Sequence, residues 1–191
     1  MPGTPPEPSL SEKVLLIEAT MQSARIPHAF GGAIALAYYA TPRATIDIDV
    51  NVFVDSERAD EVLSALARLG AEAPTDSERV RLNRDGQARI RWGATPVDLF
   101  FSYDAFHDAC MERRRAFPFG EGETIHVLAA EDLVVFKAIF DRDKDWRDIT
   151  ELVFAVGDEL DADWIERWLE RIVGREDERY RRCLAALAAS T

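Results

Sequence analysis

The sequence predicts an α+β fold, in which a small mixed sheet flanked by helices is followed by a C-terminal bundle of helices. Residues 46–54 alternate between apolar and polar side chains, which indicates a strand with one packed and one polar face. Residues 130–188 carry apolar side chains at helical spacing. Strands and helices do not alternate regularly before them, which argues against a βαβ repeat. The expected organisation is a disordered lead-in (1–9), an α/β core (10–128) and a helical C-terminal part packed on the core (129–191).

Periodicity and helix-ending residues place the individual elements. Val14, Ile17 and Met21 lie at helical spacing, and Pro27 ends that helix. Gly70 ends a second amphipathic helix. The expected elements of the first half are a helix at 11–25, a strand at 28–30, a helix at 33–39, a strand at 46–54 and a helix at 57–69. The later ones are a hairpin at 78–92, a strand at 95–101, a helix at 103–115, a strand at 124–127, and helices at 130–142, 146–157, 162–173 and 176–188.

The hairpin at 78–92 depends on its loop length. A two-residue loop would place Leu82 opposite Arg89 and mix the two faces, whereas a three-residue loop pairs Leu82 with Ala88. The hydrophobic pattern favours the second register, with Gly86 in the left-handed conformation.

That register places four arginines on one face of the hairpin as cross-strand like-charge pairs, which destabilises a sheet without counter-charge. One hypothesis is that this face meets an anion, either a triphosphate or the end of an RNA. The alternative is pairing with the acidic residues of the protein itself. The arginines are Arg79, Arg81, Arg89 and Arg91.

Composition narrows the functional classes. The chain has 191 residues, with 23 basic and 35 acidic side chains and a net charge of −12, which argues against a broad grip on nucleic acid but leaves room for a small basic patch. Cys110 and Cys183 stand apart and suggest no zinc site. The longest nearly apolar run, 29–40, is too short to span a membrane. The first residues lack the pattern of a signal peptide, so we expect a cytoplasmic protein without membrane contacts.

Carboxylates on two predicted strands suggest a metal site. Asp47 and Asp49 lie two residues apart and project to the same side, so they repel each other unless a cation compensates. Mg²⁺ or Mn²⁺ suits such oxygen ligands. Asp98 lies on the polar face of a further strand and would complete a triad that holds two metals if the strands are neighbours. The alternative is that these carboxylates are simply solvated.

Two further features carry a functional and a structural interpretation. Gly31-Gly32, between a strand and a helix, allows backbone to approach a phosphate, or simply makes a tight turn. Lys137 lies in an otherwise apolar helix, where a lysine is costly unless it is paired. Asp141 is a structural partner one turn on. Asp145 and Asp148 share a helix face and either orient Lys137 or Arg142, or cap the helix start.

Together these residues resemble the polymerase-β-like nucleotidyltransferase superfamily, and more closely its AbiEii-type (MNT-like) bacterial toxins. The first motif of that family, a glycine pair followed by a helix and an Asp-hydrophobic-Asp strand, matches Gly31-Gly32 and 47–49. Its third carboxylate matches Asp98. The resemblance covers about residues 28–155, and Gly32 replaces a serine that many members carry. A later basic and acidic segment of the family matches Lys137, Arg142, Lys144, Asp145 and Asp148.

The resemblance implies a nucleotidyltransferase fold and the transfer of a nucleoside monophosphate from an NTP to an acceptor hydroxyl. Asp47 and Asp49 would hold the metal that carries the triphosphate, and Asp98 a second metal that activates the acceptor. The other implied catalytic residues are Lys137, Asp145 and Asp148. The implied nucleotide-binding residues are Gly31, Gly32, Arg43, Thr45, Lys137 and Arg142.

Three assignments of function stay open. The toxin resemblance implies transfer to an RNA (tRNA) 3′ end and a cognate antitoxin as partner. The net charge of −12 favours a cationic small molecule, such as an antibiotic, as the acceptor. A catalytically silent binding protein of the same fold is the third possibility, and the intact carboxylate triad argues against it.

Overall fold

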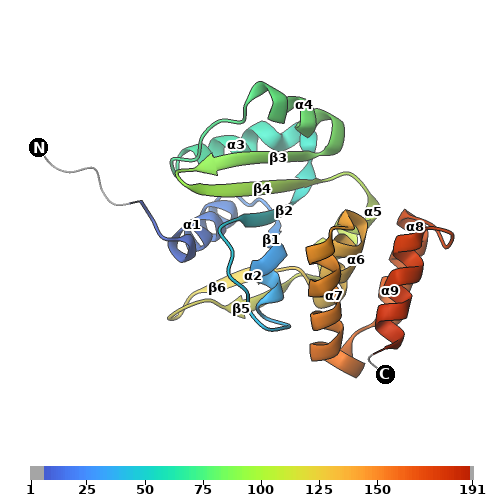
Figure 1. The fold of residues 1–191 in the computed structure, drawn as a ribbon. Helices are drawn as coiled ribbons and strands as arrows, with labels where there is room; N and C mark the ends of the chain where they lie inside the picture. Colours follow the sequence, from blue (N-terminus) through green and yellow to red (C-terminus); the bar gives the residue numbers. More distant parts are fainter. Residues whose placement is uncertain (1–6, 190–191) are drawn as a thin grey trace, which may run out of the picture.

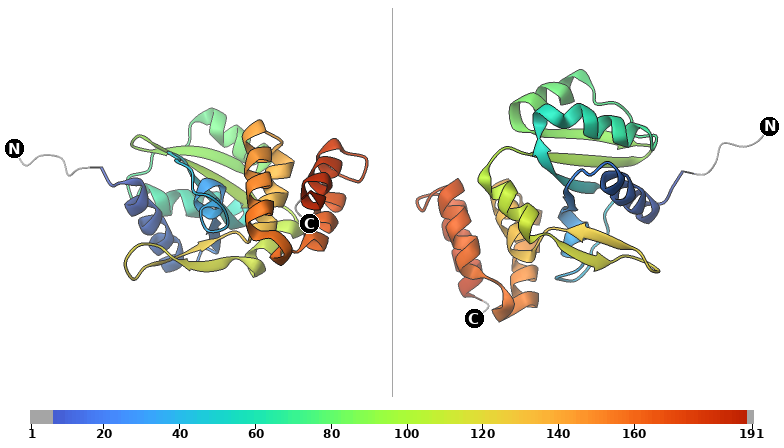
Figure 2. Two further views of the ribbon diagram at one scale, coloured as in Figure 1. Left: turned by 60° about the horizontal axis from the view of Figure 1, so that its bottom comes forward. Right: turned by 180° about the vertical axis from the view of Figure 1, so that it is seen from behind.

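The computed structural model describes residues 7–189 (Figures 1 and 2). The strands are β1 (His28–Phe30), β2 (Ile48–Asp55), β3 (Gln87–Trp92), β4 (Thr95–Ser102), β5 (Arg115–Pro118) and β6 (Thr124–Val127). The helices are α1 (Leu10–Ser23), α2 (Gly32–Leu36), α3 (Ala59–Ala67), α4 (Asp76–Asp85), α5 (Ala105–Arg113), α6 (Ala130–Phe140), α7 (Asp143–Val156), α8 (Ala162–Ile172) and α9 (Glu178–Ala188). Two 3₁₀ turns, η1 (Ser56–Arg58) and η2 (Gly157–Glu159), complete the described chain.

One mixed sheet organises the fold, in the strand order β3-β4-β2-β1-β6-β5. β2 runs parallel to β4, and β1 runs parallel to β6, while the other neighbours are antiparallel. The apolar residues of β2 predicted to share one face, among them Ile48, Val50 and Val52, are fully buried at 0% exposure. The view from behind shows α1 and α3 across the back of the sheet (Figure 2). The predicted α+β class is therefore confirmed.

The C-terminal helices cluster around α6 at one side of the sheet (Figure 1). α6 contacts α7, α8 and α9, and it also contacts α2 of the core. Ala138 of α6, Ile149 of α7 and Leu169 of α8 are each 0% exposed, because one apolar stripe of each helix faces the others. α6 and the start of α7 supply the wall opposite the polar face of the sheet. No helix in the described part of the chain is long and apolar enough to cross a membrane.

The predicted hairpin at 78–92 is wrong. Its first half is the helix α4, which Thr75 caps by accepting a hydrogen bond from the Glu78 backbone N–H. Gly86 does adopt the left-handed conformation, with φ +64°, but as the C-cap of that helix. β3 pairs instead with β4 across a two-residue turn at Gly93-Ala94.

Two further predictions concern the helix at 103–115 and the lead-in at 1–9. The predicted helix at 103–115 ends at Arg113, and Arg115–Pro118 forms the edge strand β5. Of the lead-in expected at 1–9, residues 1–6 lie outside the described residues. Glu7 accepts hydrogen bonds from the Lys13 ammonium and the Ala94 backbone N–H.

Candidate active site

Three carboxylates gather on one face of the sheet, where β2 and β4 run side by side. Asp49 on β2 is paired with Asp98 on β4 in the parallel register, and Asp47 lies two residues before Asp49. Paired residues of neighbouring strands, like residues two apart on one strand, project from the same face. The two strands are thus neighbours, as the hypothesis of a triad required.

Within residues 7–189, the Asp49 carboxylate has no partner in hydrogen-bonding or ion-pairing contact. Burial, and then the charge of Asp98, raises its pKa from 3.8 to about 6; Asp47 acts in the same direction, against Lys137 and Lys144. A half-buried acid left in this state is typical of functional sites, and a bound cation would relieve the repulsion.

Arg89 on β3 neutralises Asp98. Its Nε and Nη2 donate to the two carboxylate oxygens of Asp98 at 2.8 and 2.6 Å. This bidentate pair raises the pKa of Arg89, so the guanidinium stays charged. The proposed pairs between hairpin arginines do not form, because Arg79 and Arg81 lie on α4.

The alternative of pairing within the protein accounts for three of the four arginines of the predicted hairpin. Arg79 pairs with Asp60 at 3.3 Å, and Arg81 pairs with Glu78 at 3.8 Å. The third is Arg89, which binds Asp98.

A divalent cation fits the donors of this face. As they stand, no three His, Cys, Asp or Glu side chains of the described residues are arranged to hold a metal ion. Asp47, Asp49 and Asp98 nevertheless supply the carboxylate oxygens that Mg²⁺ and Mn²⁺ prefer. The observation that fits a metal is the half-buried charge of Asp49, which no hydrogen bond or ion pair from the described residues reaches. Arg89 occupies one lone-pair position on each Asp98 oxygen, so it competes with a metal for that carboxylate.

The glycine pair lies against the carboxylates. Gly32 has φ +53°, and a methyl group at this position would lie 1.7 Å from Asp49 Oδ2. A side chain is therefore excluded by both conformation and space. The Gly31 N–H donates to the backbone oxygen of Asp49 at 2.9 Å, so it is already used within the protein. Whether the pair also binds phosphate stays a prediction.

Basic side chains face the carboxylates from the helical wall. Lys137 of α6 is 4% exposed and donates to Asp148 at 2.5 Å, with Asp145 at 3.7 Å. Arg43, from the loop before β2, makes a bidentate pair with Asp148 at 3.1 and 3.0 Å. Although burial opposes it, these bonds lower the pKa of Asp148. The expected alternative partner Asp141 accepts instead from Trp146.

The two other basic side chains of the pocket, Arg142 and Lys144, differ in their contacts. Arg142 donates to Asp145 at 2.6 and 3.2 Å, which holds it at the start of α7. Lys144 also lines the pocket, and no ion pair or hydrogen bond within residues 7–189 engages its ammonium. Its charge opposes the raised pKa of Asp49. Lys144 belongs to the basic and acidic motif but was not predicted as a site residue, although its place next to Asp145 in the sequence was a usable signal.

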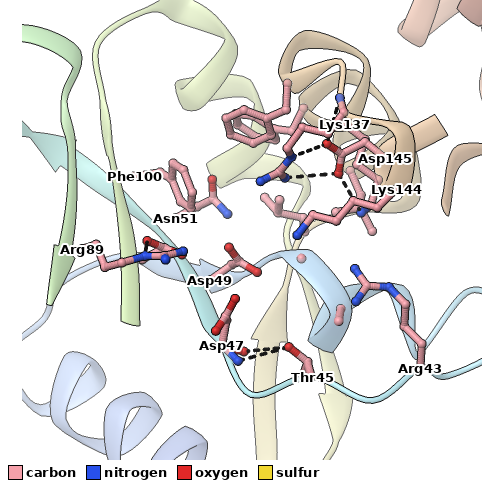
Figure 3. A pocket seen from close by; sticks show the side chains of 18 residues that line it. Arg43, Thr45, Asp47, Asp49, Asn51, Arg89, Phe100, Lys137, Lys144 and Asp145 are labelled. Atoms are coloured by element: carbon pink, nitrogen blue, oxygen red, sulfur yellow. Dashed lines mark hydrogen bonds and ion pairs between the residues drawn. The ribbon is translucent and has the colours of Figure 1, made fainter. Parts of the chain in front are cut away.

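The sheet face and the helical wall together line one pocket, whose empty volume is about 690 Å³ and includes space open to solvent. Figure 3 shows Asp47 and Asp49 directed into it, with Lys144 across from them. Thr45 lies at its rim and bonds the Asp47 backbone N–H at 3.2 Å. Asn51 lies on the polar face predicted for this strand but was not predicted as a site residue; it is 4% exposed and extends that face beyond Asp49. Such an arrangement of anionic and cationic walls suits a metal-bound polyphosphate.

No protein-family model matches this sequence, and no curated protein matches it. Solved structures do share its fold. Antibiotic-resistance factor ANT(2'')-Ia has 14% identity and a TM-score of 0.52, covering 94% of this chain and 89% of that chain. An antigenic nucleotidyltransferase-like protein from Paracoccidioides brasiliensis has 15% identity and a TM-score of 0.51, covering 94% and 87%. A candidate nucleotidyltransferase from H. pylori has 14% identity and a TM-score of 0.50, covering 94% and 91%. At these identities the likeness establishes the fold.

Proposed function

We propose that the protein is a metal-dependent nucleotidyltransferase, which moves a nucleoside monophosphate from an NTP to an acceptor hydroxyl. The observation that carries the proposal is the row of Asp47, Asp49 and Asp98 facing Lys137 and Lys144 across one pocket. The fold shared with nucleotidyltransferases supports the same class.

The carboxylates would bind the divalent cations, which neutralise the triphosphate and lower the pKa of the acceptor hydroxyl. Asp47 and Asp49 are assigned to the cation on the triphosphate, and Asp98 to the acceptor side. In the transfer, the acceptor oxygen bonds to the α-phosphorus while the bond to pyrophosphate breaks. The hydroxyl proton passes to a carboxylate of the pocket or to water.

The basic wall would stabilise the negative charge of the transferred and leaving groups. Lys137 is fixed by Asp145 and Asp148, so little rearrangement is needed before it acts. Arg43 and Arg142 are held in the same way and would contact the phosphates. The remaining assignments to the nucleotide are Gly31, Gly32 and Thr45.

For the acceptor we propose an RNA 3′ end, such as that of tRNA, in a toxin-type cytoplasmic enzyme with a cognate antitoxin. The segment Lys137–Asp148 supports this assignment, since it carries the resemblance to AbiEii-type toxins. The competing acceptor is a cationic small molecule. The net charge of −12 and the fold shared with the resistance factor ANT(2'')-Ia favour it.

A label-transfer assay tests the proposal. The protein is incubated with each α-labelled NTP, Mg²⁺ or Mn²⁺, and either total tRNA or an aminoglycoside. Asp49→Asn serves as the inactive variant, and Asp108→Asn, an exposed carboxylate on α5, serves as the matched control. Label on tRNA that Asp49→Asn alone abolishes supports the RNA acceptor. Label on the aminoglycoside transfers the assignment to small molecules, and the absence of pyrophosphate release with every acceptor rejects the enzyme.

A further inference from the structure

We propose that an aromatic cavity next to the candidate active site binds a nucleobase. The inference rests on the proposed function, because a nucleotide chemistry in the neighbouring pocket is what brings such a ring here. The cavity lies between β4, α5 and α6. Its empty volume is about 410 Å³, which includes space open to solvent. Its walls include Gln87, Phe100, Tyr103, Asp104, Phe136 and Phe140.

The cavity adjoins the carboxylate pocket. Phe100, Phe136 and Phe140 line both spaces. Phe100 follows Asp98 by two residues on β4 and therefore projects from the same face. Figure 3 shows its ring beside the carboxylates. A ligand that reaches from one space to the other would thus present its reacting group to Asp98 and its remaining part to the phenyl rings.

The aromatic walls are held in place by one another. The rings of Phe100 and Phe140 have centroids 5.6 Å apart and are tilted by 52°. Phe136 packs against Phe106 at 5.0 Å and against His107 at 5.4 Å. Flat rings stack on such surfaces with little loss of side-chain entropy, whatever the identity of the base.

Polar atoms at the cavity wall suit the edge of a base. The Gln87 oxygen accepts from Arg81 at 2.9 Å, while no residue of the described chain bonds its amide nitrogen. Asp104 Oδ1 accepts from two backbone N–H groups and from His107, and its second oxygen has no partner within residues 7–189. A donor and an acceptor beside aromatic rings match a heterocycle that carries both groups.

Two sources supply the same chemistry, namely the terminal base of the acceptor and the base of the NTP. Proximity to Asp98, the carboxylate assigned to the acceptor side, favours the acceptor. Uncharged nucleosides are the appropriate probes, because without phosphates they report on the ring alone.

The test measures the binding of adenosine, guanosine, cytidine and uridine to the full chain. Saturation-transfer NMR on the base protons detects the binding. We expect at least one nucleoside to bind. Phe100→Leu and Phe140→Leu keep apolar volume but remove the flat surface, and should weaken binding by about five- to a hundredfold. The matched control is Phe154→Leu on α7, because that phenyl group is 82% exposed and lies outside the cavity. Tyr103→Ala, at a side chain 64% exposed, gives a second variant with little risk to folding.

Equal binding by wild type and all three cavity variants, or no binding of any nucleoside, overturns the proposal. A second measurement separates the two sources. If Phe100→Leu raises the Kd of a non-hydrolysable NTP with Mn²⁺, the base belongs to the NTP. If it raises only the KM of the acceptor, the base belongs to the acceptor. Pyrophosphate release without nucleoside binding rejects the cavity alone, whereas nucleoside binding without nucleotidyl transfer rejects the proposed function alone.

Discussion

Two carboxylates on opposite sides of the sheet, the buried Glu18 and the half-buried Asp49, have opposite environments. Glu18 of α1 lies behind the sheet and accepts hydrogen bonds from His28, His126 and Gln22. Burial raises its pKa, but these bonds, led by that of His28, outweigh burial and lower the pKa to about 2. No donor among residues 7–189 bonds Asp49, and its pKa is raised to about 6.

The number of hydrogen-bond donors around a carboxylate distinguishes a structural role from a functional one better than its burial does. Glu18 joins α1, β1 and β6 through its partners, so its charge is satisfied within the fold. Asp49 is held next to Asp98 and Asp47, an arrangement that costs stability unless a cation is bound. Glu18, with His28 and His126 as its partners, has a structural role, which we call the Glu18 clamp. Asp49, which no described residue bonds, belongs to the candidate site.

The largest expected effect is that of Asp49→Asn. Activity should fall by on the order of a thousandfold or more, because a catalytic metal contributes several kcal/mol to the transition state. In metal-free buffer at pH 7 the same variant should have a higher thermal midpoint than wild type, since the repulsion is removed. Label transfer and calorimetry measure the two effects, with Asp108→Asn as control. A variant that remains active, or that melts at a lower temperature, would place Asp49 in the same structural class as Glu18.

Glu18→Gln should act in the opposite direction. The amide nitrogen faces hydrogen-bond donors, so the free energy of unfolding should fall by about 1–3 kcal/mol. Label transfer by the folded protein should remain, and Glu61→Gln, a side chain 46% exposed, is the matched surface control. Because the pKa of Glu18 is lowered on folding, its stabilisation is present above pH 4.5 and is lost as the pH falls toward 2. Urea midpoints at pH 7, 5 and 3 should therefore decline less in the variant, and parallel declines would contradict the clamp.

Gly32→Ala tests the contact between the glycine pair and Asp49. A methyl group at a φ of +53° costs about 1 kcal/mol on conformation alone, and here it also meets Asp49 Oδ2 at 1.7 Å. Gly174→Ala is the matched control, because Gly174 has φ +85° and no atom within 4 Å of the added methyl. Gly32→Ala should lose more stability than Gly174→Ala and should weaken Mn²⁺ binding. Equal losses in the two variants would mean that Asp49 moves aside without cost.

The carboxylate face was predictable because it depends on a strand period of two. The alternation around Asp47 and Asp49, repeated around Asp98, specified which side chains share a face before any strand pairing was known. Lys137 was likewise visible as a charge in an apolar helix. For Asp49 to lie opposite Asp98, the strands must be neighbours in a matching register, and the structure shows both conditions.

The region at 78–92 was predicted wrongly because the signals for the start and the end of a helix were not weighed. Thr75 and Glu78 have the spacing of a helix cap, and Gly86 ends the helix, so the apolar Val80 and Leu82 belong to α4. The actual strand turn at Gly93-Ala94 pairs Ile90 with Val97, which was an equally good hydrophobic match. The contact of Arg89 with Asp98 follows only from this register, so the wrong hairpin concealed it.

The smallest expected effect concerns that contact. Arg89 engages both oxygens of Asp98 and carries a charge that opposes a divalent cation. Arg89→Gln should therefore raise the affinity for Mn²⁺ by about two- to fivefold, a modest gain because the arginine side chain is 50% exposed. Arg91→Gln, two residues along the same strand and outside the pocket lining, is the matched control. Electron paramagnetic resonance of free Mn²⁺ measures the affinity. Weaker binding in Arg89→Gln would mean that the arginine positions Asp98 for the metal, and equal binding would mean that Asp98 is not a ligand.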